Sequence, residues 1–362
     1  MVLTALSIHN LRNLQSATLT PGPRLNLICG ANASGKTSLL EAIYLLGRGR
    51  SFRSAYSRRI VRHDEGDLTV FGRLQSDKGH QHSLGVQIKD GRFRAKVDGV
   101  YQQKSSNLAG VLPLLFISPD GDKLIKGSPR QRRRYIDWGL FHVEHGFLGA
   151  WQRYNRLLHQ RNALLRQGQR HQLRTWDLQL IQAADQLDSL RRHYVQQLAS
   201  EAGHFLAHLL ADVAIDVTYL PGWPSEAHYE EALKDGLESD LKARFTQRGP
   251  HRADLSLRVG GKPAAEVLSG GQQKLAACAL LLAQAAVLNR RRDEHCLVLV
   301  DDLPAELDRQ HRQRFMKLLY ATGSQLFVTA TDPDFLDVSG YADHCMFHVE
   351  QGRIQAEKED GG

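Results

Sequence analysis

Cysteine is scarce in this sequence of 362 residues: there are four, Cys29, Cys278, Cys296 and Cys345, and no two form a C-x-x-C pair. Widely spaced cysteines among apolar or small neighbours are typical of reduced thiols in a protein core. This scarcity argues against a disulfide-stabilised secreted domain. The histidines are scattered and complete no ligand set with other residues, so we expect no structural zinc site.

Long apolar runs are also lacking. Residues 1–14 contain no basic stretch followed by a sustained apolar one, so they do not resemble a secretory signal. The most apolar segment, residues 275–288, is interrupted by Gln284 and is shorter than the about 20 residues that a membrane helix needs. These absences predict a cytoplasmic protein with no membrane partner.

The composition itself, with 42% hydrophobic and 24% charged residues, is that of a soluble globular protein. A length of 362 residues suits one large or two ordinary domains. The formal net charge of +8 favours a polyanionic partner, although many basic proteins bind neither nucleic acid nor membrane. The position of the charges is therefore more informative than their sum.

Short apolar segments at both ends of the chain predict an α/β fold. The segment at residues 25–29 leads through a glycine-rich loop into a helical pattern over residues 39–46, which is the order strand, loop, helix. An Asp90-Gly91 turn between two further segments predicts a hairpin in an antiparallel side sheet. The other expected strands cover residues 5–11, 68–74, 83–88, 92–97, 112–117, 296–300, 325–329 and 345–349.

The middle of the chain has a different pattern. Apolar residues recur every three or four positions over residues 151–165 and 173–198, with a break around Gly168, which predicts a helical hairpin. We therefore expect one α/β lobe, built from residues 1–118 and 262–362, and an inserted, mainly helical and basic lobe over residues 119–261.

The glycine-rich loop, residues 30–37, reads GANASGKT and matches the P-loop pattern G-x-x-x-x-G-K-[ST]. Glycines let backbone N–H groups wrap around phosphates, and the helix N-terminus adds its positive dipole. Lys36 is expected to reach the β- and γ-phosphates of ATP, and Thr37 to hold Mg²⁺ through its hydroxyl. The expected ATP-binding residues here are Gly30, Asn32, Gly35, Lys36, Thr37 and Ser38. The pattern alone indicates only an NTP-binding protein.

A second phosphate-related pattern is an apolar strand at residues 296–300 that ends in two carboxylates. Asp301 is expected to support the metal, and Asp302 to orient or deprotonate the attacking water. Asp302 and Lys36 are therefore the expected catalytic residues. The alternative is an ordinary buried strand that exits at a polar loop.

Residues 268–272 read LSGGQ immediately before a helical pattern, and this run resembles the signature of ABC-type ATPases. In that superfamily the signature residues of one subunit cap the γ-phosphate bound by the other, so the resemblance implies an ATP-dependent homodimer. Asp308 lies where the superfamily has its D-loop. The alternative is a glycine-rich linker. The expected capping residues are Ser269, Gly270, Gly271, Gln272 and Asp308.

The insert between the P-loop and Asp301 is too short for the long coiled coil of some members of the superfamily. Four short segments are similar to motifs of the RecF family. The resemblance implies an ATP-dependent, DNA-binding recombination mediator that acts at gapped DNA with RecO and RecR to help load RecA. It also implies a slow, DNA-stimulated ATPase. The four runs are Asn10-Leu11-Arg12-Asn13, residues 49–53, residues 116–133 and Gly249-Pro250-His251-Arg252.

One departure from the superfamily bears on turnover: Thr329 and its neighbours stand where the switch histidine is common, so hydrolysis should be slow. Two other interpretations stay open. The energy subunit of an ABC transporter would need a permease-docking surface instead of basic tracts. A scaffold with a vestigial ATP site is disfavoured by intact Lys36, Thr37, Asp301 and Asp302.

Basic residues, mostly arginines, are clustered in three tracts that contain no acids, at residues 48–62, 123–134 and 153–174. Such tracts suit contact with DNA phosphates, although charge runs often only solvate a surface. We expect sequence-independent binding, preferably to duplex, with strong salt dependence. Arg12 and Arg132 are alternative candidates for contact with nucleotide or with the partner subunit. The candidate DNA contacts are Arg50, Arg53, Arg130, Arg132, Arg133, Arg156 and Arg161.

Overall fold

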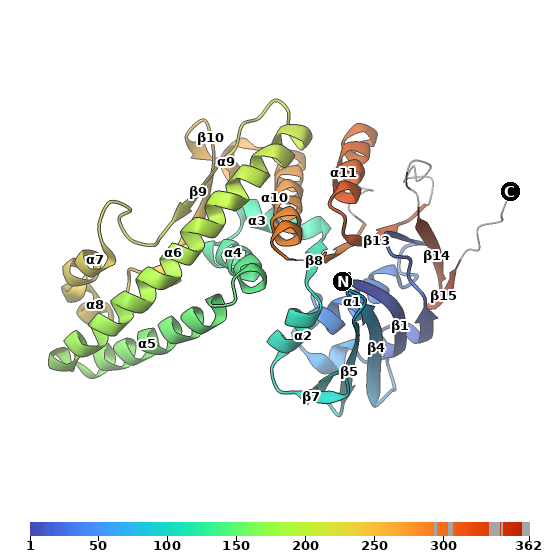
Figure 1. Ribbon diagram of the computed structural model, residues 1–362, viewed down its shortest axis with the longest axis horizontal. Coiled ribbons are helices and arrows are strands. Elements are labelled where there is room, and N and C mark those ends of the chain that lie inside the picture. Colours follow the sequence, from blue (N-terminus) through green and yellow to red (C-terminus); the bar gives the residue numbers. More distant parts are fainter. Residues whose placement is uncertain (293–294, 303–306, 333–340, 342, 357–362) are drawn as a thin grey trace. The chain divides into compact units, whose positions relative to one another are not determined.

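The computed structural model describes residues 1–292, 295–302, 307–332, 341 and 343–356. The chain divides into two compact units, the first formed by Met1–Gly121 with Leu288–Gly362 and the second by Asp122–Val287 (Figure 1). Residues 262–287 were expected in the α/β lobe, but their contacts group them with the inserted unit. The segment with the LSGGQ run therefore belongs to the second unit.

The first unit contains a six-stranded sheet in the order β15-β14-β3-β13-β12-β8. Its strands are parallel except for the antiparallel pair of β14 and β15. All residues of β3 and β12 are buried, as expected for parallel strands covered on both faces. The strands are β3 (Leu25–Cys29), β8 (Leu114–Ile117), β12 (Leu297–Val300), β13 (Gln325–Ala330), β14 (His344–Glu350) and β15 (Arg353–Ala356).

The side sheet of this unit is antiparallel throughout, in the order β2-β1-β4-β5-β6-β7. The expected hairpin turn is present: Asp90 and Gly91 have φ of 52° and 74° and join β5 to β6. The strands are β1 (Val2–Leu11), β2 (Leu14–Leu19), β4 (Asp67–Gln75), β5 (Gln81–Lys89), β6 (Arg92–Val97) and β7 (Val100–Gln102).

Helix α1 (Lys36–Arg48) contacts strands of both sheets, and its apolar residues join the core between them. This packing holds the N-terminal end of α1 beside the carboxyl ends of β3, β12 and β13. The unit also contains α2 (Ser105–Val111), α11 (Arg309–Ala321) and the short 3-10 turns η1 (Ser57–Ile60) and η2 (Pro119–Asp122).

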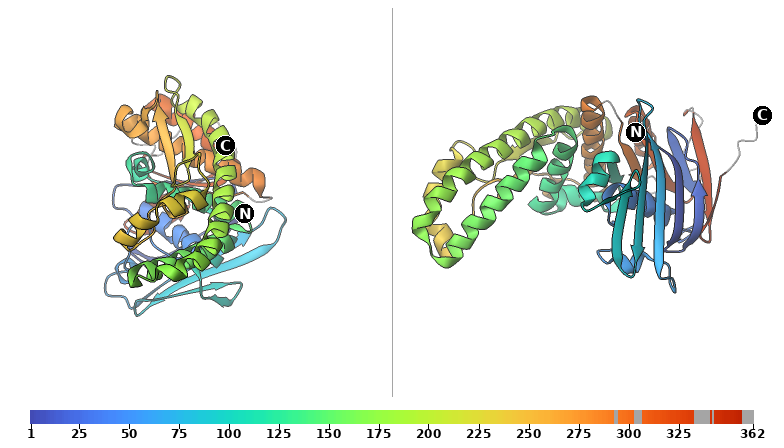
Figure 2. Two further views of the ribbon diagram at one scale, coloured as in Figure 1. Left: turned by 90° about the vertical axis from the view of Figure 1, so that its left-hand side faces the viewer. Right: turned by 60° about the horizontal axis from the view of Figure 1, so that its bottom comes forward.

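The second unit is mainly helical. Its long hairpin of α5 (Phe147–Gln167) and α6 (Arg170–Leu209) confirms the helical hairpin predicted from the apolar periodicity (Figures 1 and 2). Gly168, with φ of 69°, ends α5 in the left-handed conformation that favours glycine. A small antiparallel sheet has the order β11-β10-β9. These strands are β9 (Asp216–Leu220), β10 (Asp254–Val259) and β11 (Lys262–Pro263).

The remaining helices of the second unit include α10 (Gly270–Arg291), which follows the LSGGQ run. By length and composition α10 could cross a membrane, but 72% of its most apolar window is buried inside the protein. Burial of that extent is typical of a core helix. The others are α3 (Lys123–Lys126), α4 (Pro129–Val143), α7 (Tyr229–Asp235), α8 (Leu237–Ala243), η3 (Pro250–Arg252) and α9 (Ala264–Val267).

Candidate nucleotide-binding site

The loop between β3 and α1 needs its glycines. Gly30 and Gly35 have φ of 153° and 127°, and a Cβ on Gly30 would lie 2.2 Å from the backbone oxygen of Val349. Only glycine adopts this backbone there without strain. The loop therefore turns tightly onto the first turn of α1, where backbone N–H groups without intrahelical partners can bind an anion.

Lys36 and Thr37 occupy the first turn of α1. Lys36 is buried, and its Nζ donates to the backbone oxygens of Gly30 at 2.8 Å and Ala31 at 3.2 Å. Thr37 Oγ1 donates to Asp301 Oδ1 at 3.0 Å, which joins the P-loop to the end of β12. The two motifs, 264 residues apart in sequence, thus meet at one edge of the sheet. A hydroxyl and a carboxylate are hard oxygen donors of the kind that Mg²⁺ prefers, so this pair fits the metal.

The two carboxylates after β12 have different environments. Burial raises the pKa of Asp301, and the charge of Asp302 acts in the same direction, while the hydrogen bond from Thr37 opposes them. Asp302 has a left-handed backbone, with φ of 45°, and faces the cavity described below. Its backbone N–H donates to Thr329 Oγ1 at 2.7 Å. Thr329 therefore fixes the turn that carries Asp302.

Thr329 stands where a switch histidine is common, but it contacts the site through its own hydroxyl. Its hydroxyl oxygen also lies 3.1 Å from Asp301 Oδ1 and 3.3 Å from Asp302 Oδ1. Thr329 occupies β13, which pairs with both β3 and β12, so the parallel register brings it to the ends of both motifs. The Thr329 side chain is thus part of the site and does not merely fill the position where a histidine is common.

A cavity of about 1090 Å³ opens over this edge of the sheet. Its volume is slightly above the about 300–1,000 Å³ typical of ligand pockets. Asn32, Gly35, Lys36, Thr37, Ser38 and Asp302 line it, as expected for nucleotide-binding residues. Gly30 shapes the loop without lining the cavity. The rest of the cavity wall is mainly basic, with Arg12, Arg53, Arg58, Arg59 and Arg62 beside the acids Asp64 and Glu65.

Two polar residues beside these arginines had no role predicted from the sequence. Asn13 accepts the Ser38 hydroxyl at 2.8 Å and donates to the backbone oxygen of Ser34 at 3.0 Å, so it braces the P-loop. Glu41 is fully buried in α1 and forms a bidentate ion pair with Arg12. A single acid within an apolar helical pattern was the available signal for Glu41.

The LSGGQ run forms the start of α10. Ser269 and Gln272 cap the helix reciprocally: Ser269 N–H donates to Gln272 Oε1 at 2.9 Å, and Gln272 N–H donates to Ser269 Oγ at 3.3 Å. A Cβ added at Gly270 or Gly271 would meet nothing within 4 Å. The packing of this chain therefore does not require these two glycines, and they leave open space at a helix N-terminus.

Asp308, the expected D-loop residue, has a local role in the first unit. It is the N-cap of α11, where its Oδ1 accepts the backbone N–H of His311 at 3.0 Å. The hydrogen bonds from His311 lower the pKa of Asp308. Residues 305–306 of the expected D-loop lie outside the described residues.

The candidate DNA contacts separate into two groups. Arg50, Arg53, Arg130 and Arg156 are exposed. Arg132, in contrast, donates to both carboxylate oxygens of Asp254, at 2.7 and 2.9 Å. Arg133 donates to the backbone oxygen of Ala253 at 2.7 Å, and burial lowers its pKa. Arg132 and Arg133 thus stabilise the second unit itself.

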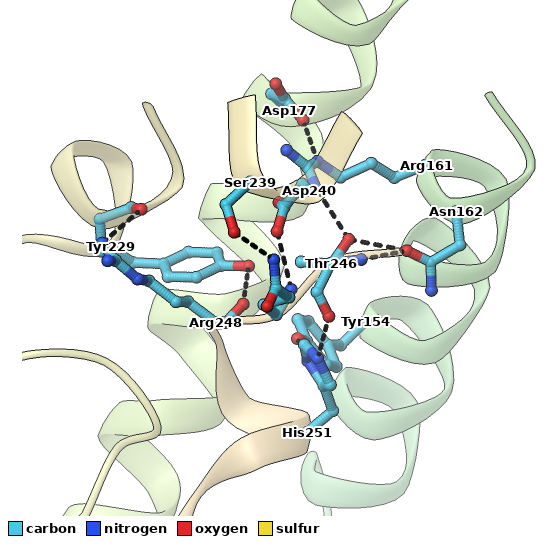
Figure 3. Close-up of polar contacts among 12 residues, drawn as sticks. Tyr154, Arg161, Asn162, Asp177, Tyr229, Ser239, Asp240, Thr246, Arg248 and His251 are labelled. Carbon is cyan, nitrogen blue, oxygen red and sulfur yellow. Dashed lines mark hydrogen bonds and ion pairs between the residues drawn. The ribbon is translucent and has the colours of Figure 1, made fainter. Parts of the chain in front are cut away.

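Arg161 has a structural role in place of the predicted DNA contact. Its side chain has no exposed surface and forms ion pairs with Asp177 and Asp240, both at 2.7 Å. It also donates to Thr246 Oγ1 at 2.7 Å, and Asn162 Oδ1 accepts the backbone N–H of Thr246 (Figure 3). A fully buried guanidinium cannot reach a DNA phosphate, so the predicted DNA contact at Arg161 is wrong.

The P-loop, the carboxylate strand and the parallel sheet define an ABC-type P-loop ATPase head. The chain matches the family model "RecF/RecN/SMC N terminal domain" over residues 2–355. It is 44% identical over 356 residues to the DNA replication and repair protein RecF of Shewanella baltica, covering 98% of this chain and 99% of that one. It is 43% identical over 359 residues to RecF of Pseudomonas paraeruginosa, with coverage of 98% and 97%. The chain therefore belongs to the RecF family.

Solved structures agree with this assignment. The recombination mediator protein RecF with ATP, of the RecFOR pathway, has a TM-score of 0.84 at 28% identity, covering 99% of this chain and 98% of that one. An SMC head bound to the C-terminal winged-helix domain of ScpA has a TM-score of 0.64 at 15% identity, with coverage of 99% and 98%, and shares the fold. The α/β ATPase-head prediction is confirmed, and a transporter subunit is not favoured.

Proposed function

We propose that the chain is an ATP-dependent, DNA-binding recombination mediator that acts at gapped DNA in the cytoplasm. With RecO and RecR it would help to load RecA, while ATP drives its dimerisation and slow, DNA-stimulated hydrolysis resets it. The observation that carries the proposal is the Thr37–Asp301 hydrogen bond, because it joins the two phosphate-related motifs at one cavity. The relative with bound ATP supports the choice of nucleotide.

The nucleotide chemistry follows from four side chains. Lys36 and the N–H groups at the start of α1 would bind the phosphates. Thr37 and Asp301 would hold Mg²⁺, which when bound neutralises charge that develops on the phosphates. Asp302 would orient the attacking water or accept its proton. Because Thr329 rather than a histidine stands beside these carboxylates, we expect slow turnover.

Dimerisation would use the open helix N-terminus of α10. Ser269, Gly270, Gly271 and Gln272 present backbone N–H groups and a hydroxyl without bulky side chains, which suits a phosphate approaching from another subunit. Asp308 would contact the same interface. Each subunit would bind ATP through its own P-loop, and the capping contacts that form only when ATP is bound would shift the equilibrium toward the dimer.

DNA would contact the exposed arginines Arg50, Arg130 and Arg156, whereas Arg53, also exposed, lines the nucleotide cavity. Arginine contacts to phosphates give affinity without sequence preference and release counterions, so binding should weaken steeply with salt. RecR and RecO are expected as partners because the RecF structures belong to the RecFOR pathway.

A gel-shift experiment tests the proposal. The purified chain is titrated against gapped duplex, intact duplex and single-stranded DNA, with ATP, with ADP or without nucleotide. We expect the tightest complex with gapped DNA and ATP, and its loss in Lys36→Ala, which removes the phosphate-binding ammonium. If the wild type binds DNA equally well with and without ATP, the proposal of an ATP-dependent mediator is refuted. It is also refuted if the protein binds no DNA and binds only vesicles that carry a permease.

A further inference from the structure

Glu41 is a fully buried carboxylate on α1 that holds one arginine of the cavity wall. Its Oε2 accepts Arg12 Nε at 2.9 Å, and its Oε1 accepts Arg12 Nη2 at 3.0 Å. The third nitrogen of Arg12, Nη1, donates to the backbone oxygen of Arg59 at 2.7 Å. Bidentate geometry fixes the plane of a guanidinium as well as its position. Arg12 is therefore held at the cavity wall with its orientation set by Glu41.

The same carboxylate also organises a second arginine. Glu41 Oε1 accepts the hydroxyl of Ser51. Ser51 Oγ in turn accepts the backbone N–H groups of Arg53 and Ser54, each at 2.9 Å. Arg53 lines the same cavity as Lys36 and Thr37, so its position bears on the candidate ATP site. Ser51 thus links Glu41 by hydrogen bonds to the turn that carries Arg53.

Fixing the side chain of Arg12 and the backbone turn that carries Arg53 before a ligand arrives has a direct consequence for affinity. An arginine that is ordered only on binding loses rotamer entropy at that moment, about 0.5–1.5 kcal/mol for each immobilised side chain. A fixed backbone turn and a bidentate pair remove part of this cost in advance. Because Glu41 is fully buried, water does not compete for its oxygens.

We propose that Glu41 is a positioning residue for ATP, which preorganises Arg12 directly and Arg53 through Ser51. Glu41 touches no ligand itself and acts only through these side chains. The inference rests on the proposed binding of ATP by this chain. It adds to that proposal the claim that one buried carboxylate couples two arginines of the cavity wall.

The test measures ATP binding by isothermal titration calorimetry, so turnover is not involved. Glu41→Gln keeps the shape of the side chain but replaces one acceptor oxygen by a donor. We expect the Kd for ATP to rise about tenfold, the effect of losing one charge-assisted hydrogen bond. Asp90→Asn, in the exposed β5–β6 turn, is the matched control for net charge and should leave the Kd unchanged. A wild-type Kd in Glu41→Gln overturns the inference.

A double-mutant cycle separates positioning from mere support of the fold. Arg53→Ala should raise the Kd about tenfold in the wild type but less than threefold in the Glu41→Gln background, because the turn has already lost its anchor. If the increases in Kd caused by Glu41→Gln and Arg53→Ala simply multiply in the double variant, the inference is overturned. Should Glu41→Gln fail to fold, Ser51→Ala, on the part-exposed turn, replaces it in the same cycle. A wild-type protein that binds no ATP at all would instead refute the proposed function.

Discussion

The backbone N–H of Asp302 donates to the hydroxyl oxygen of Thr329 at 2.7 Å, and this bond holds the expected catalytic carboxylate in its left-handed turn. Thr329→Val keeps the branched shape but leaves that N–H without its partner. We expect kcat for ATP hydrolysis to fall about tenfold, as one lost hydrogen bond of about 1.4 kcal/mol predicts. ATP affinity should change less than kcat, because the P-loop is untouched.

Asp302→Asn is the comparison for this experiment. It removes the base itself and should reduce hydrolysis by about 100-fold or more while ATP still binds. Single-turnover hydrolysis and equilibrium binding of ATP measure the two effects separately. If Thr329→Val hydrolyses ATP at the wild-type rate, the hydroxyl does not position Asp302.

Local patterns predicted the phosphate-binding elements well. The strand at Leu25–Cys29 has the expected bounds, and α1 begins at Lys36, where the P-loop pattern places it. The Asp90-Gly91 turn also has the expected conformation. These features depend on residues adjacent in sequence, namely apolar periodicity, glycines with positive φ and a helix start, so single-sequence reasoning can find them.

Ion pairs between residues far apart in the sequence could not be predicted in this way. Arg161 lies in an acid-free tract, yet its partners Asp177 and Asp240 are 16 and 79 residues away and come from other elements. Glu41 likewise pairs with Arg12, 29 residues earlier. A charge pattern along the chain shows which side chains are cationic. It does not show which of them the fold neutralises and buries.

Ser269→Arg tests capping between subunits. Its side chain would fill the open space before α10 and should keep the protein monomeric with ATP, while the ATP affinity of each subunit remains within about threefold of the wild type. Light scattering after gel filtration, with and without a non-hydrolysable ATP analogue, measures the change. Ser269→Ala is the matched control, because it loses the same helix cap, about 1 kcal/mol, without adding bulk. Wild-type dimers in Ser269→Arg would contradict the proposed capping.

Arg161 and Arg156 lie on the same helix, α5, and form a matched pair for separating stability from DNA binding. Arg161→Met leaves the buried Asp240 and the part-buried Asp177 without their cation and should lower the free energy of unfolding by about 3–5 kcal/mol. Arg156→Ala, at an exposed position, should change stability by less than about 0.5 kcal/mol. Urea unfolding followed by circular dichroism measures both.

The same two variants should behave oppositely toward DNA. If Arg156 contacts a phosphate, its loss reduces the dependence of log K on log salt by about 0.9, whereas folded Arg161→Met keeps the wild-type slope. Fluorescence anisotropy with a labelled duplex, at four salt concentrations, measures the slopes. A lower slope in Arg161→Met would mean that the buried guanidinium becomes available to DNA.

His251 makes the stability of the second unit dependent on pH. Its Nε2–H donates to the backbone oxygen of Thr246 at 2.9 Å, so its Nδ1 accepts the Tyr154 hydroxyl at 2.7 Å, and the ring is neutral (Figure 3). Burial lowers the pKa of His251 to about 4. The unfolded chain, with a histidine pKa of about 6.5, therefore binds more protons than the folded one between these values.

The contribution of His251 to the free energy of unfolding should consequently have its full value above about pH 6.5. It should decrease as the pH falls toward about 4, by up to about 3 kcal/mol. His251→Gln removes the titrating ring and should flatten that part of the profile, although it is less stable than the wild type at pH 7.5. His145→Gln, at an exposed position, should leave the profile unchanged. Urea unfolding at pH 4.5, 5.5, 6.5 and 7.5 gives the three profiles. If wild type and His251→Gln lose stability in parallel on acidification, protonation of His251 is not the cause, and the buried carboxylates around Arg161 become the groups to replace.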